Sequence, residues 1–290
     1  AYVAWPSQLL GSAPPAVLSI VCPDLREMVG TGLGEWVYRS SIRKAGLVDA
    51  LTEPIRDGLV RSGVAVERIR VSSGSFVDTT RFAPVRRKEP WVVFSGRFVE
   101  EKNPLLFIEA CALVRSRLRT RLPGLRFFVI GDGPLRSKVE AAVAQEGLSS
   151  SVEVGWRDDV EQILGRAQLF LSLQRTDNYP SQALLEAMAC ECAVVATDVG
   201  QTERLVDGGV GLRVDATPTA VAEAVAQLLE NPARTAQMGR RGRQRVMAAH
   251  STDAYLDYVE SVYADMAGGS PVITKTVAYA SRFTSHASRS

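Results

Sequence analysis

The segment from Asp177 to Glu186 has the residue types of an anion-binding helix start. It follows an apolar run of strand length, and Pro180 suits the first position of a helix. The free backbone amides of Ser181, Gln182 and Ala183 would then point out of the helix start. Free amides at this position favour a phosphate group, so the segment predicts a phosphate-binding helix.

Glu186 lies almost two turns into the same expected helix, among apolar residues. A carboxylate in such surroundings is costly to bury unless donors satisfy it. Two interpretations stay open. Arg97 or Lys102 is a structural partner of Glu186, or the carboxylate accepts hydrogen bonds from a ribose diol.

A second polar loop follows the apolar run Trp91–Ser95. Gly96 lets the backbone approach a ligand, and the side chains of Arg97 and Lys102 can reach a shared anion from either side of the turn. The alternative is a solvated loop before a helix that begins at Pro104.

Two further loops carry glycine turns. Gly131 and Gly133 form one, but Arg136 stands where a dinucleotide fingerprint has its third glycine. Gly200 forms another at an expected helix start. Each turn has two interpretations, a simple chain reversal or a ligand loop.

The elements that must position these loops alternate between strand and helix from Trp91 onward, which is typical of a parallel sheet wrapped by helices. The expected strands are Trp91–Ser95, Arg126–Ile130, Val152–Gly155, Gln168–Leu173, Ala193–Thr197 and Val210–Val214. An apolar stripe predicts a helix through Phe107, Cys111, Val114 and Leu118. Asp158 and Glu161 predict a capping box for another. Ligands of such sheets lie beyond the carboxyl ends of the strands, where the polar loops fall.

The residues on either side of this sheet predict further parts of the chain. A shorter α/β unit is expected in front, with strands at Ala16–Val21, Val48–Thr52 and Arg68–Ser72 and helices at Trp36–Ala45 and Pro54–Ser62. Arg81–Pro90 has the composition of an exposed linker. We expect domains at 1–84 and 85–250, a last helix within 251–267, and a serine-rich disordered tail at 268–290.

Composition limits the function class. Thirty-four basic and thirty-two acidic residues leave a net charge of +2, which does not indicate a nucleic-acid partner. Apolar runs stay shorter than the ~18 residues of a membrane span, and the start lacks the basic residues of a signal peptide, so a cytoplasmic protein is expected. The chain opens at Ala1 without an initiator methionine, which suggests a fragment. Reduced core thiols without a metal are expected at Cys22, Cys111, Cys190 and Cys192.

Taken together, these stretches resemble the carboxyl-terminal domain of family 4 (group 1) retaining glycosyltransferases of glycosyltransferase B fold. The resemblance runs from about Trp91 to Met266, and Val17–Pro84 resembles the end of the family's amino-terminal domain, including Leu51–Glu53 and Gly74–Asp78. It implies two Rossmann-like α/β domains. The amino-terminal one is incomplete, and the carboxyl-terminal one is complete with a parallel sheet.

The resemblance also implies roles for the polar residues. Arg97 and Lys102 would bind the donor diphosphate, and Glu186 would hold the ribose. The first glutamate of the family's pair falls at Asn178, so this amide or the neighbouring Asp177 would act near the transferred sugar. The implied catalytic set is Arg97, Lys102 and Asn178.

The other implied contacts lie in the same loops. Gly155, Trp156 and Arg157 resemble the family's base-binding loop, and on the acceptor side only Asp24 matches. The further donor-binding residues are expected to be Gly96, Gly131, Gly133, Asp177, Tyr179, Ser181, Gln182 and Ala183.

The implied reaction moves a sugar from a nucleoside diphosphate sugar to a glycan or lipid-linked acceptor, as in bacterial polysaccharide biosynthesis. The leaving diphosphate takes the acceptor proton, no metal or cofactor is needed, and the protein contributes positioning and charge stabilisation. Two alternatives stay open: a nucleotide-sugar epimerase of the same fold, and a sugar-nucleotide-binding protein without transfer activity. Asn178 and the short front favour the second, and the chain itself is expected to bind donor but to transfer little or none.

A basic run at Arg115, Arg117, Arg119 and Arg121 ends one expected helix. It predicts either a solvated helix end, where cations suit the helix dipole, or a contact with anionic lipid head groups. The second interpretation would place the protein peripherally on the inner face of the membrane.

Overall fold

A computed structural model describes residues 17–20, 32, 36, 40, 42, 45–72, 74–207 and 209–266. These residues form two compact units. The larger unit is Ser75–Thr252, and the smaller unit combines the described residues up to Gly74 with those from Asp253 onward. The dividing line falls at Gly74 and Ser75, whereas the sequence places it after residue 84.

The larger unit is built on a six-stranded sheet in which every neighbouring pair is parallel. The strands are β4 (Glu89–Ser95), β5 (Arg126–Ile130), β6 (Val152–Gly155), β7 (Ala167–Ser172), β8 (Ala193–Thr197) and β9 (Gly211–Val214). Their order is β6-β5-β4-β7-β8-β9, so the direction of winding reverses between β4 and β7. The predicted α/β class and parallel sheet are confirmed.

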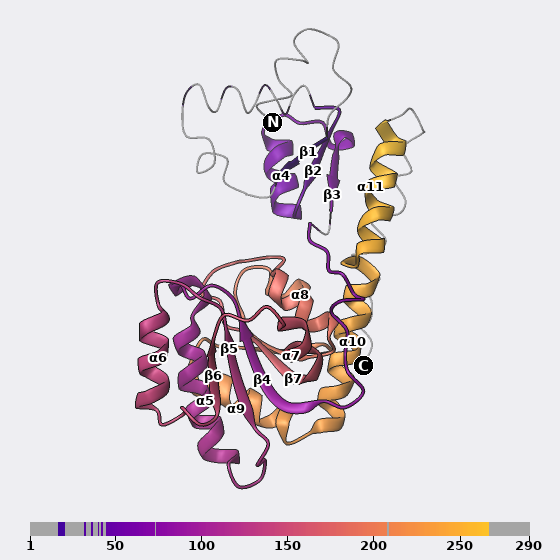
Figure 1. Cartoon of the computed structure of the whole chain (residues 1–290). Coiled ribbons are helices and arrows are strands. Elements are labelled where there is room, and N and C mark those ends of the chain that lie inside the picture. Colours follow the sequence, from indigo (N-terminus) through magenta and orange to yellow (C-terminus); the bar gives the residue numbers. More distant parts are fainter. Residues whose placement is uncertain are drawn as a thin grey trace, which may run out of the picture. The chain divides into compact units, whose positions relative to one another are not determined.

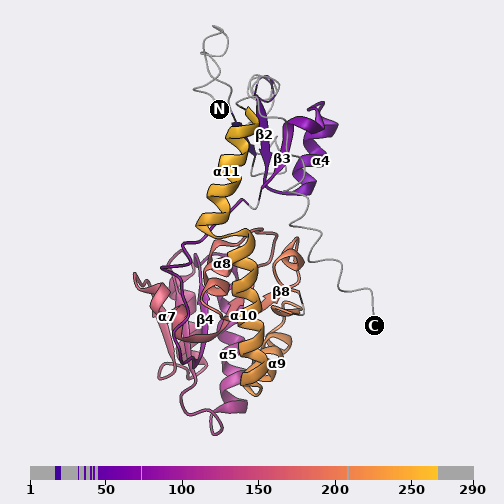
Figure 2. The same ribbon diagram turned by 90° about the vertical axis from the view of Figure 1, so that its right-hand side faces the viewer.

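Helices cover both faces of this sheet (Figure 1). One face carries α5 (Pro104–Leu118), α6 (Arg136–Gln145) and α9 (Pro218–Leu229), and the other carries α7 (Val160–Arg166), α8 (Gln182–Ala189) and α10 (Pro232–Ala249). Figure 2 shows α10 lying across its face of the sheet. Each face of the sheet has its own hydrophobic core, and alternate residues of β4 are buried in one or the other. Val92 and Phe94 lie in the core on the α5 side, and Val93 lies in the core on the α8 side. The predicted stripe from Phe107 to Leu118 is buried in the first core.

Two predictions for the larger unit are wrong. The supposed linker Arg81–Pro90 belongs to the unit, because the half-buried Lys88 donates from Nζ to the carbonyl oxygens of Leu164 (3.3 Å), Ala167 (2.9 Å) and Cys190. The capping box at Asp158 does not form, since α7 begins after Asp159 without a side-chain cap.

The smaller unit has a three-stranded parallel sheet in the order β1-β2-β3. Its elements are β1 (Val17–Ile20), β2 (Leu47–Ala50), α4 (Glu53–Arg61), the short 3-10 helix Val66–Arg68, β3 (Ile69–Val71) and α11 (Thr252–Met266). The hydroxyl of Tyr258 on α11 donates to Asp49 on β2 at 2.6 Å, and Asp265 pairs with Arg70 on β3 at 2.7 Å.

Several predictions lie outside the described residues. These are the acceptor-side residue Asp24, the thiol of Cys22, most of the helix expected at 36–45, and the tail at 268–290. The other three cysteines are free and buried, as the sequence predicts.

Candidate functional site

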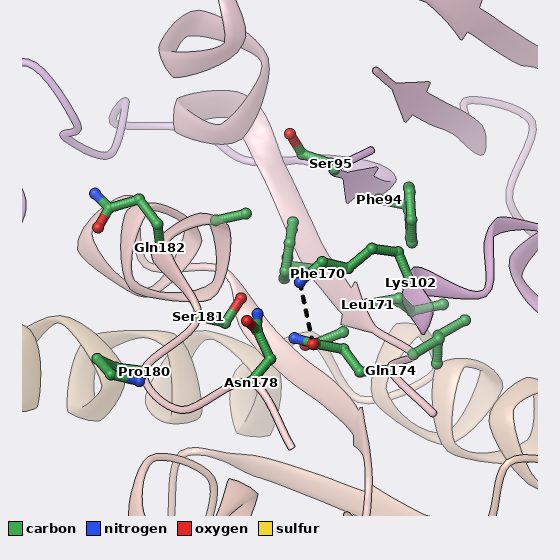
Figure 3. Close-up of a pocket in the computed structure, with 14 residues that line it drawn as sticks. Phe94, Ser95, Lys102, Phe170, Leu171, Gln174, Asn178, Pro180, Ser181 and Gln182 are labelled. Atoms are coloured by element: carbon green, nitrogen blue, oxygen red, sulfur yellow. Dashed lines mark hydrogen bonds between the residues drawn. The ribbon is translucent and has the colours of Figure 1, made fainter. Parts of the chain in front are cut away.

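A cavity of about 290 Å³ lies at the carboxyl ends of β4 and β7 (Figure 3). The two connections that leave these strands run to opposite sides of the sheet, and such a reversal leaves a crevice that ligands occupy in α/β proteins. Its polar lining residues are Ser95, Lys102, Ser172, Gln174, Asn178, Ser181 and Gln182. Gly96, Ala183 and the apolar Phe94, Phe170, Leu171, Leu173 and Pro180 complete the described lining.

Lys102 is the one charged side chain among the described residues that line the cavity. Its Nζ donates to Oε1 of Gln174 at 3.2 Å, a neutral partner. Burial lowers the pKa of the Lys102 ammonium group, and the nearby Glu101 opposes this only in part. A partly desolvated cation held by a neutral amide is stabilised by an anion that enters the cavity.

The start of α8 is a second feature that would favour an anion in the cavity. The helix begins at Gln182, with Ser181 as its N-cap residue in an extended conformation. Pro180 therefore precedes the helix, and the prediction that it is the first helical residue is wrong. The amides without an intrahelical partner are those of Gln182, Ala183 and Leu184, one residue later than expected.

Figure 3 shows the side-chain ends of Asn178 and Ser181 directed toward the pair formed by Lys102 and Gln174. Ser181 is buried, whereas Asn178 is exposed at the rim. The sequence singled out Asn178, Ser181 and Lys102. Gln174 was missed, although its place just beyond the end of β7 is a signal that could have found it.

Glu186 lies one turn further along α8 and does not line the cavity. Oε1 of its half-buried side chain accepts a hydrogen bond from Nε2 of Gln182 at 3.2 Å. Burial raises the pKa of Glu186, the Gln182 hydrogen bond and the charge of Arg81 oppose the rise, and Glu161 adds to it. The partner of Glu186 is thus Gln182 rather than Arg97 or Lys102.

Two other predicted site residues have local partners. The carboxylate of Asp177 accepts from the backbone amide of Gln201 at 3.2 Å and from its Nε2 at 3.3 Å, in the turn after β8. The guanidinium of Arg204 lies 5.0 Å from the ring centroid of Tyr179, and burial raises the pKa of that phenol. Neither Asp177 nor Tyr179 lines the cavity.

The predicted site residues in the loop after β4 differ in their location. Gly96 and Lys102 line the cavity, while Arg97 is exposed to solvent in the same loop. The glycine turn after β5 holds this loop in place, because a Cβ on Gly131 would lie 1.9 Å from the carbonyl oxygen of Gly96. A Cβ on Gly133 would lie 2.7 Å from that of Phe98. Close backbone packing therefore explains both glycines.

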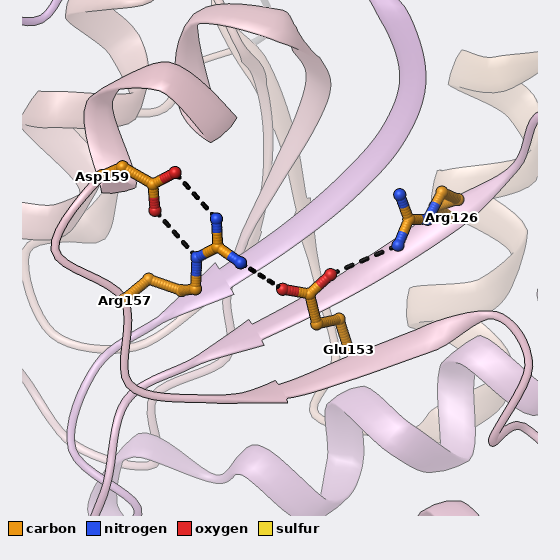
Figure 4. A network of polar contacts seen from close by, with 4 residues as sticks. All are labelled: Arg126, Glu153, Arg157 and Asp159. Carbon is orange, nitrogen blue, oxygen red and sulfur yellow. Dashed lines mark hydrogen bonds and ion pairs between the residues drawn. The ribbon is translucent and has the colours of Figure 1, made fainter.

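The loop after β6 holds Arg157 in a network of ion pairs (Figure 4). Arg157 contacts both carboxylate oxygens of Asp159, at 2.8 and 2.7 Å, and Glu153 at 2.7 Å, and these partners raise its pKa. Glu153 also pairs with Arg126 at 3.2 Å. Trp156 is 74% exposed, next to Gly155 with a φ of +146°.

Three further features of the described residues are relevant. In the basic run at the end of α5, Arg117 and Arg121 share Glu230 at 3.1 and 3.0 Å. Among the residues that the structure describes, no cluster of three or more His, Cys, Asp or Glu side chains is arranged to hold a metal ion. Nor is any helix in those ranges long and apolar enough to cross a membrane.

Comparison with known families decides the assignment. The model of the family described as glycosyl transferases group 1 matches residues 77–245, more than half of the chain. The chain belongs to this family. The match spans β4 to β9 and therefore every strand around the cavity.

Two curated relatives are longer than the chain. The chain is 28% identical over 260 residues to an alpha-D-kanosaminyltransferase of Streptomyces kanamyceticus, covering 83% of this chain and 66% of the relative. It is 30% identical over 205 residues to the lipopolysaccharide core biosynthesis glycosyltransferase LpsE of Rhizobium meliloti, covering 68% of this chain and 54% of the relative. The chain thus spans less than two thirds of both.

Solved structures share the fold. Anabaena HepE, crystallised in complex with UDP, matches with a TM-score of 0.71 and 18% identity, over 90% of this chain and 75% of that chain. Sucrose-phosphate synthase of Thermosynechococcus elongatus matches with a TM-score of 0.69 and 21% identity, over 93% and 72%. The chain therefore shares its α/β fold with these two proteins.

Proposed function

We propose that this chain forms the nucleotide-sugar half of a retaining, family 4 glycosyltransferase. The enzyme would move a sugar from a nucleoside diphosphate sugar to a glycan or lipid-linked acceptor. The observation that carries the proposal is the cavity at the reversal point of the sheet, where a half-buried Lys102 faces the start of α8. The names of the two bacterial relatives support sugar transfer in glycan or glycoside synthesis.

The donor would bind with its diphosphate between Lys102 and the free amides of Gln182 and Ala183. Charge-assisted hydrogen bonds from an ammonium group and a helix start both favour a phosphate. Arg97, exposed in the same loop, would reach the diphosphate from the solvent side. Glu186, one turn along α8, would accept hydrogen bonds from the ribose hydroxyl groups.

The base would lie at the loop after β6. Trp156 offers an exposed aromatic face there, and the ion pairs of Arg157 hold the loop in one conformation. The transferred sugar would lie near Asn178 at the rim of the cavity.

Transfer would need positioning rather than an enzyme base. The bond between the anomeric carbon and the donor phosphate oxygen breaks, and the bond to the acceptor oxygen forms on the same face. The acceptor proton passes to the leaving phosphate oxygen. Lys102, Arg97 and the α8 amides stabilise the charge that develops on the diphosphate, without a metal ion or cofactor.

A second candidate is a sugar-nucleotide-binding protein without transfer activity. Asn178 favours it, because an amide lines the cavity where the family resemblance expects a glutamate. The location we propose is cytoplasmic for both candidates. The shared ion pairs of Arg117 and Arg121 with Glu230 favour the solvated helix end over the lipid contact for the basic run.

A binding panel tests the common part of both candidates. We expect micromolar to millimolar affinity for one of the diphosphate sugars of uridine, guanosine or adenosine, and a loss in Glu186→Ala. The exposed Glu140→Ala on α6 serves as the control. If the chain binds none of these diphosphate sugars, or if Glu186→Ala binds with full affinity, the proposed site is wrong. A labelled donor then separates the candidates. Transfer of the label to an acceptor supports the glycosyltransferase, and formation of an epimer supports the nucleotide-sugar epimerase. Intact binding without a product supports the binding protein without transfer activity.

A further inference from the structure

The side chain of Gln182 joins three parts of the larger unit. It lines the cavity, and its Nε2 donates at 3.2 Å both to Oε1 of Glu186 and to the backbone carbonyl oxygen of Phe76. Residues four apart on a helix lie on the same face, so Gln182 and Glu186 meet without distortion of α8. The one amide nitrogen of Gln182 therefore bridges the Phe76 carbonyl oxygen and the Glu186 carboxylate.

In the described part of the chain, the surroundings of Glu186 offer its carboxylate few other partners. Its side chain is half-buried, and the nearby Arg81 is paired with Glu161 at 3.2 Å. Arg81, Glu161 and the thiol of Cys190 are the other titratable groups that interact with Glu186. Among the described residues, one group donates a hydrogen bond to the Glu186 carboxylate, the amide of Gln182.

We propose that Gln182 is a positioning residue for ribose recognition. Anchored on the Phe76 carbonyl group, it holds the Glu186 carboxylate in the orientation that accepts both ribose hydroxyl groups while the diphosphate occupies the cavity. The inference rests on the proposed function, because it takes the ligand to be a nucleoside diphosphate. It adds a residue that determines the preference for ribose over sugars without the diol.

The test compares two ligands on the same protein. One is whichever of UDP, GDP and ADP the wild-type chain binds best, and the other is its 2′,3′-dideoxy counterpart. We expect the wild type to prefer the ribose form by about tenfold or more, the range of hydrogen bonds to a charged group. Gln182→Leu should remove most of this preference and leave the affinity for the dideoxy ligand within about threefold.

Two further variants separate positioning from packing. Gln182→Glu keeps the size of the side chain but has no donor and repels Glu186, so it should also lose the preference. Gln182→Lys keeps a donor at this position, so it should retain the preference. The exposed Gln227→Leu on α9 is the matched control and should behave as the wild type.

The pH profile gives a readout that a purely structural role would not move. The carboxylate accepts both hydroxyl groups only when ionised, so the ribose preference is lost as the pH falls through the raised pKa of Glu186. Because the Gln182 hydrogen bond lowers that pKa, the residual preference of Gln182→Leu should be lost at a higher pH than the preference of the wild type.

The outcomes distinguish this inference from the proposed function. If the wild type binds none of the three nucleoside diphosphates, the proposed function fails. If it binds with a ribose preference that Gln182→Leu and Gln182→Glu retain, with an unchanged pH midpoint, Gln182 has no positioning role. Should the leucine variant fail to fold, the glutamate and lysine variants still decide, since position 182 is exposed.

Discussion

The ammonium group of Lys102 and the side-chain oxygen of Gln174 lie 3.2 Å apart and join the loop after β4 to the loop after β7. The contact spans the point where the order of the sheet reverses. Because Gln174 is neutral, it orients Lys102 without cancelling its charge. A carboxylate at this place would form an ion pair and remove the attraction for a phosphate.

The pair gives a first prediction. Lys102→Met should weaken the binding of a nucleoside diphosphate by roughly tenfold to a hundredfold, because a charge-assisted contact is lost. Gln174→Glu should weaken it as well, by neutralising Lys102 and repelling the ligand. Isothermal titration with UDP, GDP and ADP measures both effects. Lys138→Met, exposed on α6, should bind normally, and a variant of Gln174 that binds more tightly would refute this account.

The pKa of Lys102 gives a second prediction. Burial lowers this pKa, so the side chain loses its proton at a lower pH than an exposed lysine does. Affinity for the diphosphate should therefore fall as the pH rises through the lowered pKa. Lys102→Arg should keep its charge over the same range, because a guanidinium group does not deprotonate there. If the affinities of the wild type and of Lys102→Arg change in the same way as the pH rises, Lys102 does not contact the ligand.

A third prediction concerns the glycine that fixes the loop after β4. Alanine at Gly131 would place its Cβ 1.9 Å from the Gly96 carbonyl oxygen, at a φ of +148°. We expect the free energy of unfolding to fall by roughly 3 kcal/mol, from strain and overpacking together. Gly147→Ala is the matched control, since it has a φ of +65° but nothing within 4 Å. It should cost only about 1 kcal/mol.

Denaturant unfolding of the two glycine variants measures the difference, and titration shows its consequence at the site. Gly131→Ala should also lose affinity for the diphosphate, because the loop that carries Gly96 and Lys102 must shift. Equal stability of the two variants would mean that the close approach of the two loops is not maintained in solution.

The strands were predictable because most are short runs rich in apolar, β-branched or aromatic residues, and the parallel order follows from their alternation with helices. What the sequence did not reveal were contacts made across the fold. Asp159 is bound by Arg157, and no side chain caps α7. Lys88, in a stretch with linker composition, instead binds three carbonyl groups that only the folded chain brings together.

The sequence likewise predicted only part of the site. Lys102 and the α8 start could be recognised because they lie in the connections that leave β4 and β7, and α/β proteins bind ligands at such strand ends. The role of Asp177 could not, because its partner Gln201 lies in the turn after β8 and is paired with it only by the fold. Local sequence shows which groups are available, while tertiary contacts decide which of them remain free for a ligand.

The last prediction concerns Asn178, which separates the two candidate functions. Glu at this position would add a negative charge to a cavity whose described lining carries only the charge of Lys102. Binding of a nucleoside diphosphate should weaken by about threefold to tenfold through repulsion at partial exposure. Transfer to an acceptor per molecule of bound donor should rise if a carboxylate is what the sugar subsite lacks. Asn178→Gln, which adds length but no charge, is the control for both measurements. Suppose that Asn178→Glu binds as well as the wild type and transfers no more sugar. Position 178 then lies away from both the diphosphate and the transferred sugar. The absence of a glutamate there would no longer support a binding protein without transfer activity.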